Sequence, residues 1–378
     1  MIFQHCTQCL NPSTRPGLHF SEEGICSACL NYNNRASVNW DERQKEFLRI
    51  LDKYKSNNNY DCVVGVSGGK DSTYQVLTLL RMGLKPLAVT AVTCALSDIG
   101  RKNLDNLNKL GVDRIEISTS KPVRAAMNRH GLRTIGDISW PEHASIFSAP
   151  LRIGVQMGIP LQVWGENPAN EYGGPAAAEK TNCLTGEWFD TFSTLNGLSP
   201  LDFVGVDCIT EKDMLTFLPP SVEESQRVGI TGIFLGYYFP WDGLKNAIIA
   251  QAYGLTTFSA TVEGSIVNYE NLDNYHTGIH DYLMYLKFGF GRATSLANMF
   301  IRRGRISREE ASLMVQMHDG KFPGTCLGRS LQSILDDIAM EVDEFYAICD
   351  RFTNKEIFAT DSQGNFIKNK DGSPIKIK

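Results

Sequence analysis

Residues 62–72 read CVVGVSGGKDS, and this stretch decides the fold. The apolar run 62–66 has the length and β-branched content of a buried strand, and residues 72–82 follow a helical pattern that ends at Gly83. The loop between them consists of Ser67, Gly68, Gly69, Lys70, Asp71 and Ser72. A strand, a glycine-rich turn and a helix in this order predict a place where backbone N–H groups receive an anion.

The residue types of this loop suit a phosphate group. Its two glycines let the backbone approach closely, Ser67 and Ser72 add hydroxyl donors, and Lys70 adds a positive charge. We interpret Asp71 as a helix-start residue or an indirect Mg²⁺ ligand, because a bare carboxylate repels phosphate. The alternative is an ordinary strand-to-helix turn. The sequence of the loop fits neither the Walker A pattern nor the dinucleotide fingerprint.

Strands and helices alternate on both sides of this loop. Further strands are expected at 86–92, 114–117, 160–164 and 230–237, and helices at 101–110 and 145–157. This alternation predicts an α/β fold with a doubly wound parallel sheet. We expect a small N-terminal module at 1–38, the sheet domain at 39–241, a helical C-terminal region for substrate or partner at 242–360, and a polar tail or hairpin at 361–378.

Composition limits the partners and the compartment. The chain has 378 residues, 42% hydrophobic residues and a formal net charge of -5, so it has no general attraction to nucleic acid. No apolar run is long enough to span a bilayer, and the first residues lack the features of a secretory signal. We therefore expect a cytoplasmic protein that binds neither membrane nor nucleic acid, with its ten cysteines reduced or bound to metal.

Four of these cysteines form two close pairs near the start of the chain. Cys6 and Cys9 form one C-x2-C pair, Cys26 and Cys29 form the other, and sixteen residues separate the pairs. This spacing can place four thiolates around one Zn²⁺. The segment has no apolar core of its own, so a structural zinc would supply its folding energy. The alternative is four unrelated thiols.

A second half of the site is expected after the strand 160–164. Glu166 and Asn167 follow this strand, and ligands of open α/β sheets bind beyond the carboxyl ends of strands. Glu166 could orient ammonia or accept its proton, and Asn167 could hold a polar group of the substrate. Alternatively the two residues form a capped turn. Tyr172 and the glycines 173–174 have the composition of a loop that closes over a ligand.

The segment 280–294 mixes aromatic residues, cations and glycines in an otherwise helical region. Lys287 and Arg292 could contact an anionic substrate such as a sugar carboxylate or a nucleotide diphosphate. The alternative is that the aromatic residues belong to the core and that both cations face solvent.

The loop SGGKDS resembles that of the PP-loop ATP pyrophosphatases, and at the level of the fold the resemblance covers residues 61–238. Four features narrow it: the cysteine quartet, SGGKDS, the loop GEN at 165–167, and the stretch HDYLMYLKFGFGRAT…IRRGRISREEA…HDGKFPG. Together they resemble the N-acetyl sugar amidotransferases, the WbpG/PseA/LegA-like enzymes of bacterial surface-polysaccharide synthesis, from Cys6 to Gly324.

This resemblance implies a reaction in which ATP and Mg²⁺ turn a sugar acetamido group into an acetamidino group. Lys70, Asp71 and Glu166 would be the catalytic residues. The resemblance also implies that ammonia comes from a separate glutaminase and a cyclase-like barrel subunit similar to those of histidine biosynthesis. This sequence has no glutaminase signature of its own. The sugar is not identified, and a nucleotide-linked uronic acid and a nonulosonic acid are both compatible.

Two other functions remain open. A PP-loop tRNA thiolation enzyme also combines this loop with cysteine pairs, but it commonly needs further cysteines and a basic face. A nucleotide-binding module without catalysis would need neither the intact SGGKDS loop nor the long C-terminal region.

Overall fold

A computed structural model of the chain describes residues 4–54, 60–173, 183–184, 195 and 197–377. Within these residues a central sheet has the strand order β3-β2-β1-β4-β6-β5. Five strands are parallel to their neighbours, and β5 pairs antiparallel with β6 at the edge. The strands are β1 (Cys62–Gly65), β2 (Pro86–Val92), β3 (Asp113–Ser118), β4 (Leu161–Trp164), β5 (Cys183–Leu184) and β6 (Thr231–Phe234).

The order of the parallel strands reverses between β1 and β4. The chain runs from β1 outward through β2 to β3, and then returns to place β4 on the other side of β1. The crevice beyond the carboxyl ends of such a pair is where open α/β sheets bind ligands. Both loops predicted to form the site leave the sheet at this point.

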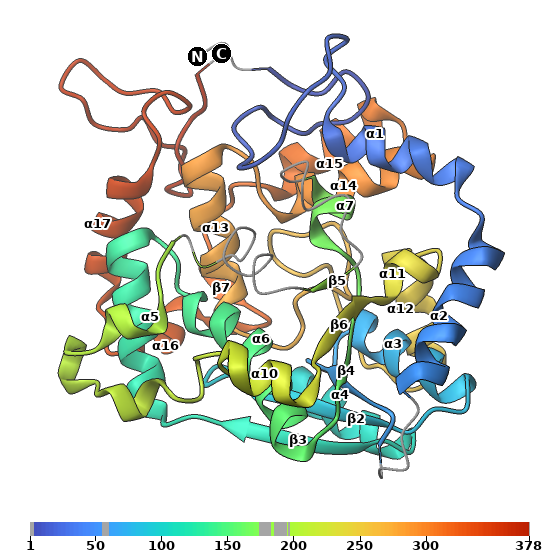
Figure 1. The fold of residues 1–378 in the computed structure, drawn as a ribbon. Helices are drawn as coiled ribbons and strands as arrows, with labels where there is room; N and C mark the ends of the chain where they lie inside the picture. The colour runs from blue at the N-terminus through green and yellow to red at the C-terminus, as the bar shows by residue number, and fades with distance from the viewer. Residues whose placement is uncertain (1–3, 55–59, 174–182, 185–194, 196, 378) are drawn as a thin grey trace.

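Helices cover both faces of the sheet (Figure 1). Val64 packs in a cluster with residues of α2 (Trp40–Tyr54), α3 (Lys70–Arg81) and α4 (Asp98–Lys109), whereas Val63 packs on the opposite face against α6 (Trp140–Met157). Burial on both faces explains why β1 is a continuous apolar run rather than an alternating one. The predicted fold class, a doubly wound parallel sheet with an N-terminal cysteine module and a helical C-terminal region, is confirmed.

The remaining helices belong to the sheet domain and to the N-terminal segment. They are α1 (Ser27–Asn34), η1 (Arg35–Ser37), α5 (Lys121–Ile135), α7 (Pro168–Tyr172), η2 (Pro200–Phe203), η3 (Val206–Cys208), η4 (Glu211–Met214), α10 (Val222–Val228) and α11 (Leu235–Tyr238).

The C-terminal region is mostly helical and lies above the sheet in Figure 1. Its helices build a second core against α5, in which Leu132 packs with Leu283 and Phe345. Its last residues pair with each other and with Phe358 through isolated bridges. The elements are α12 (Gly243–Ala252), α13 (Thr277–Phe288), α14 (Arg292–Arg302), α15 (Arg308–His318), β7 (Thr325–Cys326), β8 (Arg329–Ser330), α16 (Leu331–Asp336) and α17 (Val342–Phe352).

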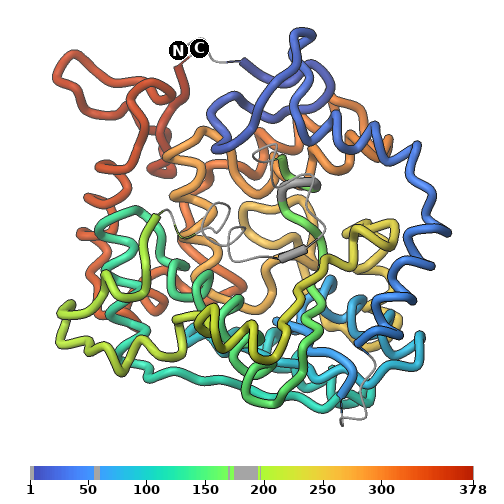
Figure 2. Tube along the Cα trace, in the orientation of Figure 1, coloured from blue at the N-terminus to red at the C-terminus, as the bar shows by residue number. Residues whose placement is uncertain are grey.

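The N-terminal module docks on these C-terminal helices. The amide N–H of Leu10 donates to Asn298 Oδ1 at 2.7 Å, and Asn298 Nδ2 donates to Asn11 Oδ1 at 2.8 Å. In Figure 2 the tube of the first residues accordingly lies beside that of α14 and α15. The N-terminal module is therefore held against α14 by hydrogen bonds to Asn298.

Several element boundaries differ from those expected. Helix α6 begins at Trp140 rather than at 145, because proline is tolerated in the first turn of a helix. Helix α2 begins at Trp40, and Asn39 Oδ1 accepts from the N–H of Glu42 in its first turn. The strand expected to reach 237 ends at Phe234.

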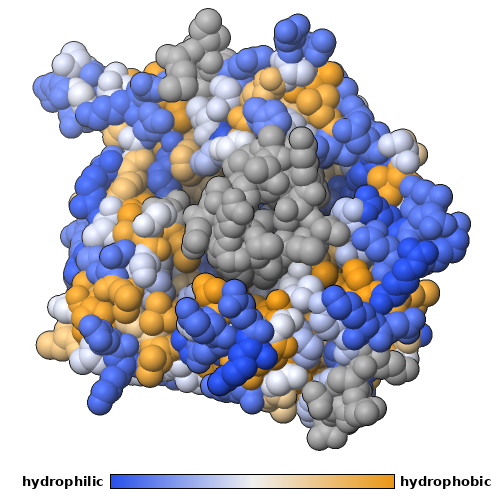
Figure 3. All heavy atoms as spheres, in the orientation of Figure 1, coloured by the Kyte–Doolittle hydropathy of each residue, from blue (hydrophilic) through white to orange (hydrophobic). Residues whose placement is uncertain are grey.

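A capping box opens α15, with reciprocal contacts of 2.8 and 3.1 Å between Ser307 and Glu310. Among the described residues, no helix is both long and apolar enough to cross a membrane. The face seen in Figure 3 carries many hydrophilic residues, with hydrophobic residues in scattered groups.

Candidate active site

The glycine-rich loop connects the end of β1 to the start of α3, as predicted. Gly68 has a φ of +82°, and a Cβ atom there would lie 2.8 Å from the backbone nitrogen of Leu104. Only glycine fits this position without strain or collision. Helix α3 begins at Lys70, so its first N–H groups face the crevice beyond β1.

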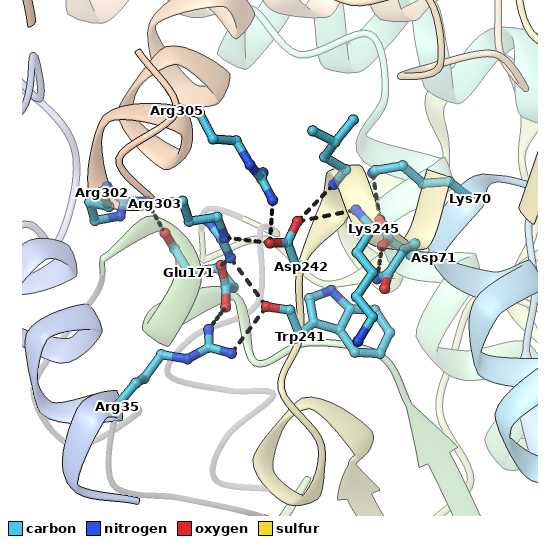
Figure 4. Close-up of polar contacts among 12 residues, drawn as sticks. Arg35, Lys70, Asp71, Glu171, Trp241, Asp242, Lys245, Arg302, Arg303 and Arg305 are labelled. Atoms are coloured by element: carbon cyan, nitrogen blue, oxygen red, sulfur yellow. Dashed lines mark hydrogen bonds and ion pairs between the residues drawn. The ribbon is translucent and has the colours of Figure 1, made fainter. Parts of the chain in front are cut away.

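Lys70 is buried, and two carboxylates hold its ammonium group. Nζ lies 2.6 Å from Asp71 Oδ2 and 2.5 Å from Glu270 Oε1. Burial disfavours the charged form of Lys70, but the two carboxylates outweigh it and keep its pKa well above the usual value. Asn246 Nδ2 donates to Asp71 Oδ1 at 2.8 Å and fixes that carboxylate (Lys70 and Asp71 in Figure 4).

Glu166 reaches the same place from the neighbouring strand. It follows β4, which pairs with β1, so the two loops meet at the reversal of strand order. Burial, together with the negative charge of Asp71, raises the pKa of Glu166 to about 8. At neutral pH this carboxyl is therefore mostly protonated, which suits a group that exchanges a proton during a reaction.

Both loops line one cavity of about 270 Å³. The volumes of small-molecule sites begin at roughly 300 Å³, so this cavity is close to the lower end of their range. Polar groups of Ser67, Asp71 and Glu166 lie at one part of its wall, and Asp273 comes from the C-terminal region. The remaining wall includes the apolar side chains of Val92, Leu96, Leu104, Ile146 and Trp164.

A cluster of arginines and carboxylates closes one side of this region (Figure 4). Glu171 in α7 accepts from Arg35 at 2.6 Å and from Arg303 at 2.8 Å. Arg303 also lies 3.4 Å from Asp242, which pairs with Arg305 at 2.5 Å. These ion pairs join the N-terminal segment, the sheet domain and the C-terminal helices beside Lys70.

The residues that follow Glu166 lie close to it. Asn167 is buried and its carbonyl accepts from the N–H of Glu171 at 3.3 Å, so it begins the short helix α7. Tyr172 is partly buried and lines a second hollow together with Lys70, Glu166 and Glu171. Burial raises the pKa of its hydroxyl above the usual value. Gly174 of the predicted closing loop lies outside the described residues.

Lys287 and Arg292 have partners of their own. Lys287 Nζ donates to the carbonyls of Ile135 at 3.3 Å and Gly136 at 3.0 Å, at the C-terminal end of α5. Arg292 forms two hydrogen bonds with Asp281, at 3.0 and 3.1 Å. Arg292 and Asp281 line a separate cavity of about 510 Å³. A substrate role stays a prediction for both, and Arg292 has the better placement for it.

The four N-terminal cysteines come together as their spacing predicts. All are fully buried, and the sulfur atoms lie 3.9 Å apart for Cys6 and Cys29 and 3.7 Å apart for Cys9 and Cys26. A tetrahedral site with Zn–S bonds of about 2.3 Å places its sulfur atoms about 3.8 Å apart. The Sγ of Cys6 also accepts from the N–H groups of Cys9 and Cys26. The donor set and geometry therefore fit a closed structural zinc site.

Comparison with known families concerns the C-terminal region of the chain, which supplies part of this site. Residues 263–370 match the family described as "LPS biosynthesis protein WbpG-like, C-terminal domain". This part of the chain is similar to that family, and residues 263–370 are called the WbpG-like domain. No curated protein matches the chain.

A likeness to a solved structure was also found. The NH3-dependent NAD synthetase from Campylobacter jejuni subsp. jejuni NCTC 11168, in complex with the nitrate ion, is 14% identical, with a TM-score of 0.29. The match covers 57% of this chain and 97% of that one. The fold assignment rests on the strand order and the glycine-rich loop described above.

The WbpG-like domain supplies parts of the site that sequence reasoning missed. Glu270 and Arg303 both lie within residues 263–370, and they contact Lys70 and Glu171 of the sheet domain. Nothing in the spacing of Glu270 or of Asn246 marks them as partners of the loop. The glycine-rich loop is therefore completed by the WbpG-like domain rather than standing alone.

Proposed function

We propose that this chain is an ATP-dependent amidotransferase that converts a sugar acetamido group into an acetamidino group. The observation that carries the proposal is the convergence of Lys70, Glu166 and Glu270. A phosphate-binding loop, a carboxyl of raised pKa and a residue of the WbpG-like domain meet at the reversal point of the sheet. This arrangement combines a nucleotide site with a proton-transfer group.

In the first step the oxygen of the acetamido group attacks the α-phosphorus of ATP, and pyrophosphate leaves. An amide carbonyl is a poor electrophile and its oxygen a poor leaving group, and adenylation corrects both. Lys70 and the N–H groups at the start of α3 would neutralise the departing pyrophosphate. Asp71 and Glu270 provide the carboxylate oxygens that Mg²⁺ prefers, and the ion would neutralise phosphate charge.

In the second step ammonia attacks the carbon of the adenylated imidate. AMP leaves with the former amide oxygen, and one proton must be removed from the attacking nitrogen. Glu166 in its ionised form would accept that proton, since it lines the cavity that the two loops form. The net change replaces the amide oxygen by nitrogen and converts ATP to AMP and pyrophosphate.

The substrate class follows from the same proposal. A nucleotide sugar or a nonulosonic acid of surface polysaccharide synthesis, such as that of lipopolysaccharide O-antigen, carries both an acetamido group and an anionic group. Arg292 would bind the anion, and Asn167 and Tyr172 would contact polar groups near the reacting amide. Ammonia would come from a glutaminase and a cyclase-like barrel subunit.

An isotope experiment tests the chemistry. The chain is incubated with ATP, Mg²⁺, ammonium and candidate sugars whose acetamido oxygen carries a heavy isotope. We expect pyrophosphate release that depends on the sugar, an amidine product, and the heavy oxygen in AMP. Heavy oxygen in free phosphate or water instead, or ATP binding without pyrophosphate release for every sugar, would refute the proposed reaction.

A further inference from the structure

Three side chains with metal-binding atoms meet at a place that the proposed reaction does not use. Asp137 lies in the turn between α5 and α6, His143 lies in α6, and His280 lies in α13 of the WbpG-like domain. One ligand atom from each falls within 4.8 Å of the others. Their carboxylate and two imidazoles come from parts of the chain that are far apart in sequence.

The distances suit a shared ion better than a direct hydrogen bond. His143 Nδ1 lies 3.4 Å from Asp137 Oδ2, and His280 Nε2 lies 3.9 Å from Asp137 Oδ1. His143 Nδ1 is buried and has no hydrogen-bond partner among the described residues. Metal–ligand bonds of about 2.0–2.1 Å place neighbouring ligand atoms of a tetrahedral site about 3.4 Å apart. A metal ion would therefore give this buried nitrogen the partner it lacks.

The ring of His280 is oriented by a second carboxylate. Its Nδ1 lies 3.2 Å from Asp281 Oδ1, which leaves Nε2 directed toward Asp137. Arg292 and Asn271 hold Asp281 at 3.0 Å each. Histidines that bind metals usually present their second ring nitrogen to a carboxylate or carbonyl in this way.

The charge of Asp137 also calls for a cation. Its side chain is only 6% exposed, and within 4.0 Å no lysine or arginine of the described chain pairs with it. The N–H of Ser139 donates to its Oδ1 at 2.8 Å. Lys287, the cation beside this turn, donates instead to the carbonyls of Ile135 and Gly136. Within 4.0 Å the two imidazoles are the only side chains of the described chain that pair with Asp137, so either a protonated histidine or a metal ion shared by the three groups must balance its charge.

We propose that Asp137, His143 and His280 bind one divalent transition-metal ion, for which zinc is the best fit. Two imidazoles and one carboxylate are ligands that zinc accepts, and three protein ligands leave one position open. The side chains of His143 and His280 are 21% and 24% exposed, so solvent or a small ligand can reach that position. The ion would tie α6 of the sheet domain to α13 of the WbpG-like domain.

The test measures metal stoichiometry on the full chain, with zinc as the probe. After removal of metal by a chelator, the chain is titrated with zinc, dialysed and analysed for bound metal. We expect two zinc ions per chain in the wild type, one in the cysteine quartet and one at the new site. His143→Ala and His280→Ala should each retain one, while His19→Ala, which removes an exposed imidazole, should retain two.

Cobalt substitution distinguishes the two sites. Cobalt bound to four thiolates gives strong sulfur-to-metal absorption, whereas cobalt at the new site would give only weak visible bands. We expect the weak bands to disappear in His280→Ala while the strong absorption remains. A wild-type chain that takes up only one zinc ion, in the cysteine quartet, would overturn the proposal, as would a His143→Ala/His280→Ala variant that still binds two.

Conservative variants keep the test valid if the alanine variants do not fold. Asp137→Asn and His280→Gln preserve side-chain size, and their fold is checked by near-ultraviolet circular dichroism. Excess zinc should raise the Tm of the wild type, already loaded in the cysteine quartet, and leave the Tm of these variants unchanged. Equal rises in Tm for the wild type and both variants would contradict the proposed ligands.

Discussion

Lys70 Nζ lies 2.5 Å from Glu270 Oε1, so the lysine of the glycine-rich loop is bound by a carboxylate of the WbpG-like domain. Asp71 holds the same ammonium group at 2.6 Å. A phosphate group that enters the loop must therefore share Lys70 with two carboxylates. A divalent cation that binds both carboxylates would release the lysine, which links metal and nucleotide binding at this site.

Replacement of Lys70 or Asp71 should abolish pyrophosphate release. Lys70→Ala removes the cation that faces the leaving group, and the loss of one such charge costs a factor of about a hundred to a thousand in rate. Pyrophosphate release is measured with a coupled assay, and the fold is checked by circular dichroism. Lys45→Ala, which removes an exposed surface lysine, is the matched control. Near-normal activity in folded Lys70→Ala or Asp71→Ala would contradict the proposed role of the loop.

The rate of the second step should rise with pH through about 8. Burial and Asp71 raise the pKa of Glu166 to about 8, and only the ionised carboxylate can accept the proton of the attacking nitrogen. Amidine formation is measured across pH at a constant concentration of free ammonia. Glu166→Gln should be slower by a factor of about a hundred to ten thousand and should lose this rise. If the rate of Glu166→Gln rose with pH by the same factor, the rise would come from the titration of another group.

The same pKa shift predicts a dependence of stability on pH. The folded state favours neutral Glu166, so this contribution to stability is full below the unfolded pKa and is lost as pH rises through about 8. Glu166→Gln cannot ionise. Between neutral pH and about pH 9, its free energy of unfolding should therefore fall less than that of the wild type. The free energies of unfolding are measured by urea denaturation at each pH. If those of the wild type and Glu166→Gln fell equally with pH, the pKa of Glu166 would not be raised in the folded state.

Removal of the cysteine site should remove the zinc ion bound there and loosen the N-terminal module. Cys6→Ser/Cys26→Ser leaves two thiolates, too few for a closed site, and the module has little apolar core besides its cysteines. Elemental analysis and limited proteolysis are the measurements. Cys208→Ser, which alters an exposed thiol, should keep the zinc and the protease resistance. Iron in the wild type, or full zinc retention in the double variant, would rule out this site.

The isolated chain should use ammonium but not glutamine. At neutral pH most free ammonia is protonated and unreactive, so efficient turnover needs local delivery. Cys62, Cys326 and Cys349 are buried, and burial raises the pKa of each thiol, which makes them poor nucleophiles. Product formation is measured with glutamine as the sole nitrogen source, with and without the glutaminase and barrel subunits. Robust turnover by the chain alone would reveal a built-in glutaminase.

Removal of Glu171 should destabilise the whole chain. It pairs with Arg35 and Arg303, and the Arg303 side chain is only 5% exposed, so Glu171→Ala leaves a buried cation with less compensation. Loss of one partner of a buried ion pair costs about 3–5 kcal/mol. The free energy of unfolding in urea is the measurement. Glu46→Ala, in a surface pair, should cost at most about 1 kcal/mol, and equal costs would refute the structural role of Glu171.

The sequence by itself determined the elements whose signals are local. The apolar run before Ser67, the two glycines and the helical pattern after Lys70 lie within a few residues, and their conformations depend mainly on one another. The spacing of the four cysteines likewise limits how their thiols can meet. Helix α5 was not predicted, because it contains Gly131 and its apolar residues form no clear stripe, so its local signal is weak.

Only the tertiary structure decided which distant residues complete each site. The sequence did not mark Glu270, Arg303 or His280 as site residues, because their roles depend on how the WbpG-like domain packs against the sheet. Lys287 and Arg292 looked alike as isolated cations. In the folded chain Lys287 donates to backbone carbonyls, whereas Arg292 pairs with a carboxylate beside a cavity. Burial and long-range packing set these pairings, and neither has a local pattern in the chain.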